Sequence, residues 1–134
     1  MTLLEYPLDC SEILRKKKAL KRAFLQDGRK RVSKKIAILG GSTTSEIKNI
    51  LELFLLKQGV DPEFYESDYN KYFEDAVFGN DDLENFSPDI VYLHVSVRNI
   101  SNFPKHDDSS VTSCINSEIE KYQKIWESLD RYDC

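Results

Sequence analysis

The chain has 134 residues and a net charge of −4, and its 40% hydrophobic and 31% charged residues exclude wholesale disorder and predict one globular domain with a real core. No apolar run approaches the roughly 20 residues that span a bilayer, so we expect a cytoplasmic protein without a membrane span. Three widely spaced cysteines without a CxxC pair argue against a disulfide framework or zinc site and predict reduced thiols.

The N-terminal segment is predicted to form a basic helix. Residues 1–35 hold 11 Lys or Arg and 4 Asp or Glu, a balance of +7, whereas residues 36–134 hold 8 and 19, a balance of −11. A basic leader could contact nucleic acid or an anionic membrane surface. Because no aromatic residues interleave the run RKKKALKR, we favour a solvated helix face beside an acidic body and expect no nucleic-acid partner.

This first helix has clear boundary signals. Asp9 followed by Glu12 fits a capping box at its start, and Asp27 with Gly28 breaks the pattern after Gln26. The apolar residues between these signals that share one helical face are Ile13, Leu20 and Phe24.

A strand, a glycine turn and a helix follow. The apolar run over 35–39, bounded by Gly40 and Gly41, is typical of a central strand buried on both faces. Thr43 followed by Glu46 fits a capping box for the next helix, which Gly59 ends. The residues that recur at helical spacing in it are Ile47, Ile50, Leu51, Phe54 and Leu55.

The rest of the chain continues the alternation of strands and helices. The predicted elements are a weak strand over 62–66, helices over 71–78 and 81–86, a convincing strand over 89–95, a long loop over 97–111 and a helix ending near Arg131. The residues on one face of this last helix are Ile115, Ile119, Tyr122, Trp126 and Leu129.

This order predicts an α/β fold: a three-layer, Rossmann-like parallel sheet with right-handed crossovers and the first strand in the centre. We assign residues 1–34 to a basic N-terminal helix and linker, and residues 35–134 to the α/β domain. Three strands are few for such a sheet, so we expect the first part of a larger domain, or a sheet that a partner completes. Dimerisation by edge pairing, or docking of a downstream domain, would protect the open edge.

The GGSTT turn is the main candidate for chemistry. Ser42 is predicted at the exit of a buried strand, beside the positive end of a helix, where free N–H groups stabilise an oxyanion or phosphate. A serine nucleophile also needs a base and oxyanion donors, and no GxSxG, GxGxxG or GxxxxGK[ST] motif is present. Three interpretations stay open: a nucleophile, an anion-binding turn, and simple strand-to-helix punctuation.

Other polar residues are weighed in the same way. His94 lies within a predicted strand and is interpreted as a hydrogen-bonded core histidine. His106, next to Asp107 and Asp108, is interpreted as part of a solvated loop, because adjacent residues rarely converge on one metal ion. Arg98 and Asn99 directly follow the last strand, where they could hold an anionic or carbonyl-bearing substrate opposite Ser42, or be structural.

Long phrases of the sequence resemble one family. The run KKIAILGGSTTSEIKNILELFLLKQGVDPEFYESDYNKYFEDAVF, followed by LENFSPDIVYLHVSVRNI, is similar to the BF1531-like N-terminal region of FkbH-like bacterial proteins. There an SGNH-hydrolase-like domain precedes a haloacid-dehalogenase-type phosphatase domain of subfamily IIIC. The leader YPLDCSEILRKKKALKR and the closing KYQKIWESL fit as well, so the resemblance covers nearly the whole chain.

The resemblance implies a flavodoxin-like α/β/α sandwich and a role in polyketide or surface-polysaccharide biosynthesis. In that family the phosphatase-like part handles a phosphoglycerate-derived glyceryl unit loaded onto an acyl carrier protein. The implied partners are therefore a downstream phosphatase-like domain and an acyl carrier protein. We expect no cofactor for this stretch, and Mg²⁺ only for the downstream domain.

The sequence departs from the catalytic blocks of SGNH hydrolases. Their Gly-Asp-Ser block aligns with Gly40-Gly41-Ser42, so glycine replaces the aspartate, and their Gly-x-Asn-Asp block falls on residues 96–99. Arg98 replaces the oxyanion-stabilising Asn, or Asn99 supplies it one position later, and the late Asp and His have no counterpart. The residues expected to contact a ligand are Gly40, Gly41, Ser42, Thr43, Ser96, Arg98 and Asn99, with no metal ligands.

Two hypotheses for function follow. The first is a binding or accessory module that acts in glyceryl or acyl transfer to a carrier protein and lacks a complete catalytic set. The second is an SGNH-type esterase or acyltransferase that uses Ser42 with a base supplied from outside these residues.

Overall fold

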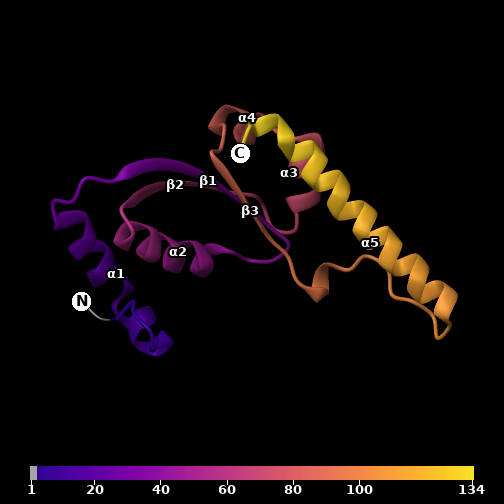
Figure 1. Ribbon diagram of the computed structural model, residues 1–134, viewed down its shortest axis with the longest axis horizontal. Coiled ribbons are helices and arrows are strands. Elements are labelled where there is room, and N and C mark those ends of the chain that lie inside the picture. The colour runs from indigo at the N-terminus through magenta and orange to yellow at the C-terminus, as the bar shows by residue number, and fades with distance from the viewer. Residues whose placement is uncertain (1–2) are drawn as a thin grey trace.

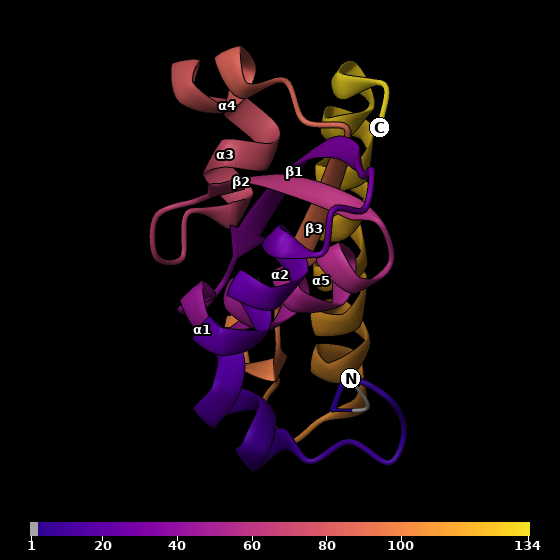
Figure 2. The ribbon, with the colours of Figure 1, turned by 90° about the vertical axis from the view of Figure 1, so that its left-hand side faces the viewer.

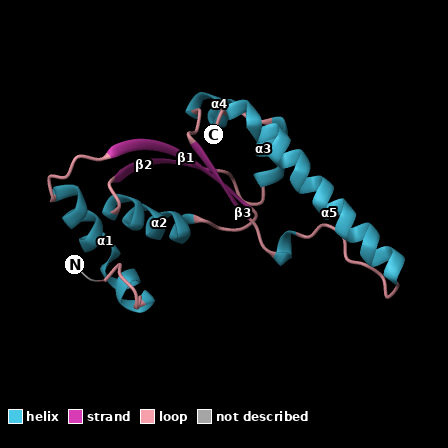
Figure 3. Cartoon of the chain, in the orientation of Figure 1, coloured by secondary structure: helices cyan, strands magenta, loops and turns pink. Residues whose placement is uncertain are grey.

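The computed structural model describes residues 3–134 and contains a three-stranded parallel sheet between helical layers (Figures 1 and 3). The strands are β1 (Val32–Gly40), β2 (Val60–Glu66) and β3 (Ile90–His94). The helices are α1 (Cys10–Gln26), α2 (Ser45–Lys57), α3 (Tyr72–Phe78), α4 (Asp81–Phe86) and α5 (Asp108–Leu129), with short 3₁₀ helices at Val97–Asn99 and Asp130–Tyr132.

The sheet has the order β2-β1-β3, with every pairing parallel, so the predicted α/β architecture with a central first strand is confirmed. Ile36 lies between Phe64 of β2 and Ile90 of β3. In Figure 2, α1 and α2 lie in front of the strands and α5 lies behind them. This arrangement is the three-layer α/β/α sandwich of a Rossmann-like fold.

The central strand is buried on both faces, as its apolar run predicts. Ala37 and Leu39 are fully buried and contact the helices α3 and α5. Ile36 and Ile38 are also buried, and by the alternation of a strand they point to the opposite face, toward α2. β1 begins at Val32, three residues before the predicted domain boundary, and the division at residues 34 and 35 stays a prediction.

The layer formed by α1 and α2 has a compact apolar core of its own. Asp9 caps α1 by accepting a 2.9 Å hydrogen bond from the backbone N–H of Glu12. The predicted capping box is only half formed, because the Glu12 carboxylate pairs with Lys16 at 2.6 Å. Ile13, Leu20 and Phe24 are buried on the predicted face of α1, where they pack against Leu53 and Leu56 of α2. Arg31, the residue before β1, contacts the ends of both helices of this layer.

Arg31 satisfies backbone carbonyls at the ends of both helices. Its guanidinium donates to the carbonyl oxygen of Phe24 at 2.7 Å and to that of Leu56 at 3.1 Å, and it pairs with Asp27 at 2.8 Å. Each carbonyl lies in the last turn of its helix and also accepts a longer backbone bond, from Asp27 at 3.3 Å and from Gly59 at 3.2 Å. A nearly buried cation therefore adds a second donor at both helix C-termini at once.

Three local predictions were wrong. The N-cap of α2 is Thr44, not Thr43, and Glu46 pairs with Lys17 of α1 at 2.7 Å instead of closing a capping box. Segment 97–111 is not one long loop, because it contains a 3₁₀ turn and the first residues of α5. Asp107 caps α5 by accepting a hydrogen bond from the N–H of Ser110 at 2.7 Å, a local signal inside a polar stretch.

Candidate functional site

The turn after β1 is held by side chains from the end of β2. The N–H of Gly40 donates to the hydroxyl of Ser67 at 2.9 Å, and the hydroxyl of the buried Thr44 donates to Glu66 at 3.2 Å. Lys48 of α2 pairs with the same Glu66 carboxylate. A Cβ on Gly40 would lie 2.6 Å from the methyl of Thr44, so only glycine lets the chain turn this tightly.

Ser42 and Thr43 lie on the outside of this turn, where both residues are exposed. Neither residue is among those that line the cavities described below. The nucleophile and anion-binding roles of Ser42 therefore stay predictions, and the turn itself is positioned by buried neighbours.

Asn99 joins the loop after β3 to the turn after β1. Its side-chain amide donates to the carbonyl of Gly41 at 2.8 Å, and its side-chain oxygen accepts from the N–H of Ser96 at 2.9 Å. The hydroxyl of Ser96 in turn accepts from the N–H of Arg98 at 3.3 Å. These bonds bring the predicted site residues from both strand ends together, and they occupy the Asn99 amide with structural contacts.

Gly41 is required by the same contact. A Cβ at Gly41 would lie 2.2 to 2.5 Å from the side-chain amide atoms of Asn99, closer than any real contact. The second glycine therefore makes room for Asn99 to reach the backbone, a role distinct from close approach of a substrate.

Helix α5 holds the other side of this loop. Lys121 donates to the carbonyl of Asn99 at 3.0 Å, and Glu118 accepts from the N–H of Ser101 at 3.1 Å. Lys121 and Glu118 form an ion pair whose side chains are 13% and 17% exposed. The hydrogen bond from Lys121 lowers the pKa of Glu118 despite its partial burial. Burial alone would lower the pKa of Lys121, but the bond to Glu118 leaves it above its ordinary value.

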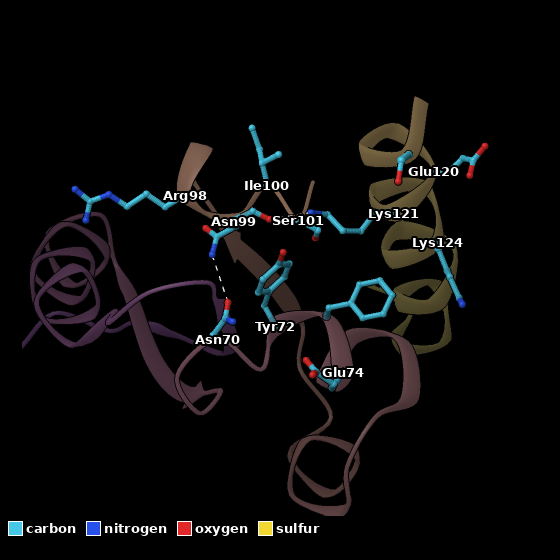
Figure 4. Close-up of a pocket in the computed structure, with 12 residues that line it drawn as sticks. Asn70, Tyr72, Glu74, Arg98, Asn99, Ile100, Ser101, Glu120, Lys121 and Lys124 are labelled. Atoms are coloured by element: carbon cyan, nitrogen blue, oxygen red, sulfur yellow. Dashed lines mark hydrogen bonds between the residues drawn. The ribbon is translucent and has the colours of Figure 1, made fainter. Parts of the chain in front are cut away.

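A polar cavity of about 550 Å³ lies between the loop after β3, α3 and α5, at the carboxyl end of the sheet (Figure 4). Its lining residues are Asn70, Tyr72, Phe73, Glu74, Arg98, Asn99, Ile100, Ser101, Ser117, Glu120, Lys121 and Lys124. Figure 4 shows the side chain of Arg98 extending away from Lys121 and Lys124, so the guanidinium and the two ammonium groups are not gathered on one spot. The lining thus includes cations, carboxylates and neutral amides.

Several of these residues were missed by the sequence analysis. Asn70 has a left-handed backbone with φ of +58° and meets the Asn99 amide at 3.4 Å, while Tyr72 is buried beneath the loop. Lys121 and Lys124 lie on a face of α5 away from its apolar stripe. The spacing of three between these lysines places them on one helix face, but only the fold brings that face to the strand ends.

Neither histidine lies in this cavity. His94 is half-buried and its Nδ1 lies 3.1 Å from the hydroxyl of Tyr92. The predicted hydrogen bond is present, but the core position is wrong, because the contact lies on an exposed face of β3. His106 is exposed in the segment before α5. All three cysteines are free, and residues 3–134 contain no group of three or more His, Cys, Asp or Glu arranged to hold a metal ion. Within the same range no helix has both the length and the apolar character for crossing a bilayer.

Comparisons with known proteins define the class of fold. No protein-family model and no curated protein matches the chain. Among solved structures, the crystal structure of the N-terminal part of BF1531 from Bacteroides fragilis, which contains a phosphatase domain and is complexed with Mg, superposes with a TM-score of 0.63 at 19% identity. The match covers 83% of this chain and 30% of the solved chain.

The likeness confirms the α/β fold and its similarity to a BF1531-like N-terminal region. The chain therefore has the fold of a segment that, in BF1531, is part of a larger phosphatase-domain protein. At 19% sequence identity the likeness shows the fold alone, and the SGNH and FkbH assignments stay predictions.

Proposed function

We propose that the chain is the N-terminal binding module of an FkbH-like protein of the haloacid-dehalogenase phosphatase superfamily, acting in glyceryl or acyl transfer to a carrier protein. The observation that carries this proposal is the polar cavity at the carboxyl ends of β1 and β3, where open α/β sheets bind their ligands. The likeness in fold to part of a phosphatase-domain protein supports the larger context.

The lining of the cavity favours a small, polyhydroxylated anion over an apolar group. Lys124 supplies a cation that no carboxylate described above neutralises, whereas Lys121 is already paired with Glu118. Glu74 and Glu120 supply acceptors for hydroxyl groups, and Ser101 supplies a short polar side chain. A phosphoglycerate-like molecule combines one charged group with hydroxyls and fits this mixture.

The partners in this proposal are a phosphatase-like domain downstream and an acyl carrier protein. The Mg²⁺ chemistry belongs to the phosphatase-like domain, and this module would hold or present the glyceryl unit. Polyketide or surface-polysaccharide biosynthesis is the pathway context that the resemblance supports.

Calorimetric titration of the full chain with 3-phosphoglycerate tests the binding role, with glycerol and inorganic phosphate as separate probes. We expect saturable binding of 3-phosphoglycerate, weakened about tenfold by Lys124→Gln through loss of one charge-assisted hydrogen bond. Arg98→Ala should weaken it less, because the Arg98 side chain extends away from Lys124 (Figure 4). Lys30→Gln, a change in the exposed segment before β1, should leave it intact. Absence of binding, or equal affinity in all variants, would refute the proposal.

The esterase alternative is kept because Ser42 is exposed directly after the buried central strand. It requires a base from outside the residues described, since His94 is engaged with Tyr92. Hydrolysis of short-chain aryl esters by the chain and by Ser42→Ala tests it. Equal rates in the two proteins remove the nucleophile, whereas a loss confined to Ser42→Ala supports it.

A further inference from the structure

We propose that the free edge of β3 and the apolar stripe of α5 form the docking surface for one more parallel β-strand, carried by polypeptide joined to the chain after Cys134. The inference rests on the proposed function only in that the chain is a module of a longer protein. Three independent features of the described residues carry it.

The first feature is the character of β3. It lies at the edge of the sheet, so its backbone groups on the side away from β1 have no strand partner among the described residues. Its sequence, Ile-Val-Tyr-Leu-His, contains no lysine, acidic residue or proline, the devices that protect natural edge strands. Strands of parallel sheets that are apolar on both faces are typically interior strands.

Both faces of β3 bear this out. Val91 and Leu93 pack into the core beneath α3 and α5, whereas Ile90 and Tyr92 point to the opposite face and are 46% and 38% exposed. An interior type of strand thus stands at an edge with half of its apolar side chains uncovered.

The second feature is the stripe on α5. Ile115, Ile119 and Trp126 are 53%, 49% and 60% exposed, although they follow the helical spacing of a buried face. They line a largely apolar groove of about 470 Å³ whose other wall is the segment from Ser96 to Ile100. In Figure 1 the N-terminal part of α5 projects beyond the strands of the sheet.

The third feature is the position of the C-terminus. Cys134 lines a second groove together with Asp89 and Ile90, at the start of β3, and Trp126 contributes to both grooves. A segment entering there would run parallel to β3, beneath α5. The resulting connection from β3 through α5 to the new strand is the standard crossover of a parallel sheet.

The geometry selects a joined parallel strand over a second copy of the chain. Pairing of two β3 edges about a two-fold axis would be antiparallel and would place both α5 helices over the same junction. A single strand needs only the space beside β3 and beneath one α5. Its apolar side chains on one face would cover Trp126 and Ile119, and those on the other face would extend the surface of Ile90 and Tyr92.

Two extended proteins, compared with the full chain, test the inference. The first carries a short Gly-Ser linker and a strand of about five β-branched residues after Cys134. In the second, alternate strand residues are proline, which cannot donate to a sheet. Hydrogen exchange of the Ile90–His94 amides is measured, together with the emission of Trp126, the single tryptophan.

In the first extended protein we expect exchange of the β3 edge amides to slow at least about tenfold and the emission of Trp126 to shift to the blue. The proline version should behave like the full chain. Trp126→Lys should abolish the protection, and Leu25→Lys, at a residue of α1 that is 55% exposed, should retain it. Equal exchange in the three proteins would overturn the inference.

A second outcome would also overturn it. If the full chain sediments as a dimer whose β3 amides are already protected and lose protection on dilution, a second copy covers the edge. Ligand binding in the polar cavity is not measured in this experiment, so the docking surface and the proposed function can fail separately.

Discussion

The molecule has two outer margins, one formed by α1 and α2 and the other by α5. Both consist of helices with an apolar face, but they differ in how far that face is buried. On one margin, the apolar faces of α1 and α2 close on each other, with Leu20, Phe24 and Leu53 buried between them. On the other margin, α5 buries Ile125 against the sheet layer and leaves Ile119 and Trp126 in solvent. Both margins carry regular apolar spacing, but among residues 3–134 only the first buries large apolar side chains between two helices, and even there Ile50, Leu51 and Phe54 of α2 stay half-buried.

The difference teaches that hydrophobic periodicity reports which face of a helix is suited to burial, and tertiary structure decides whether that face is covered. Apolar surface stabilises the fold only when it is removed from water. Apolar residues of similar size on the two margins should therefore contribute very different amounts to the free energy of unfolding.

The sharpest test of this contrast is a pair of truncations to alanine. Leu53→Ala should lower the free energy of unfolding by about 3 kcal/mol, because it leaves a cavity in the core between α1 and α2. Ile119→Ala should change it by less than about 0.5 kcal/mol, because the side chain is half exposed and alanine favours a helix. Denaturant unfolding followed by circular dichroism measures both values.

Similar losses for the two variants would mean that Ile119 is covered in solution and that the contrast between the margins is false. Sedimentation of the wild-type chain would then show whether a second copy covers it.

Much of the fold was predictable because its signals are local. The Asp9 cap, the buried run of β1 and the glycine turn each follow from a few adjacent residues, and the structure confirms all three elements. The N-cap of α2 was not predictable in this way. Thr43 satisfies the local pattern, but the helix begins after Thr44, which makes no side-chain capping bond and whose hydroxyl donates to Glu66 of β2, far along the chain.

The candidate site was predictable only in part, for the same reason. Parallel strand ends meet at one edge, which correctly brings Gly41 and Asn99 together. Lys121 and Tyr72 reach the same place through helices whose docking angle no local pattern encodes. Sequence reasoning also could not tell that Asn99 uses its amide to bind the backbone of Gly41.

The contact between the Asn99 amide and the Gly41 backbone joins the loop after β3 to the turn after β1, and its contribution to stability can be tested. Gly41→Ala should lower the free energy of unfolding by about 2 kcal/mol, because the new methyl group overlaps the Asn99 amide. When Gly41→Ala is made in the Asn99→Ala variant, its effect should be smaller by about 1 kcal/mol, because the space for the methyl group is then open. Unfolding free energies of the two single variants and the double variant give the coupling energy.

Ser42→Ala is the matched control, because its side chain is exposed one residue later and should be nearly neutral for stability. Strict additivity of Gly41→Ala and Asn99→Ala would show that the loop after β3 does not rest on the turn after β1.

The smallest expected effect concerns the ion pair by which α5 holds that loop. Lys121 lowers the pKa of Glu118 in the folded chain, so the unfolded chain binds a proton at this group more readily. The stabilisation is therefore fully present above the ordinary glutamate pKa of about 4.3 and is lost as the pH falls through the lower pKa of the folded chain.

Glu118→Gln should lower the free energy of unfolding by about 1 kcal/mol at neutral pH, and the difference from wild type should shrink on acidification. Glu120→Gln, at the exposed residue of the same turn of α5, is the matched variant, and denaturant unfolding across the acidic range measures both variants. A Glu118→Gln deficit that stays constant with pH would mean that the glutamate acts through packing and its bond to Ser101, and that the α5 margin is held without charge.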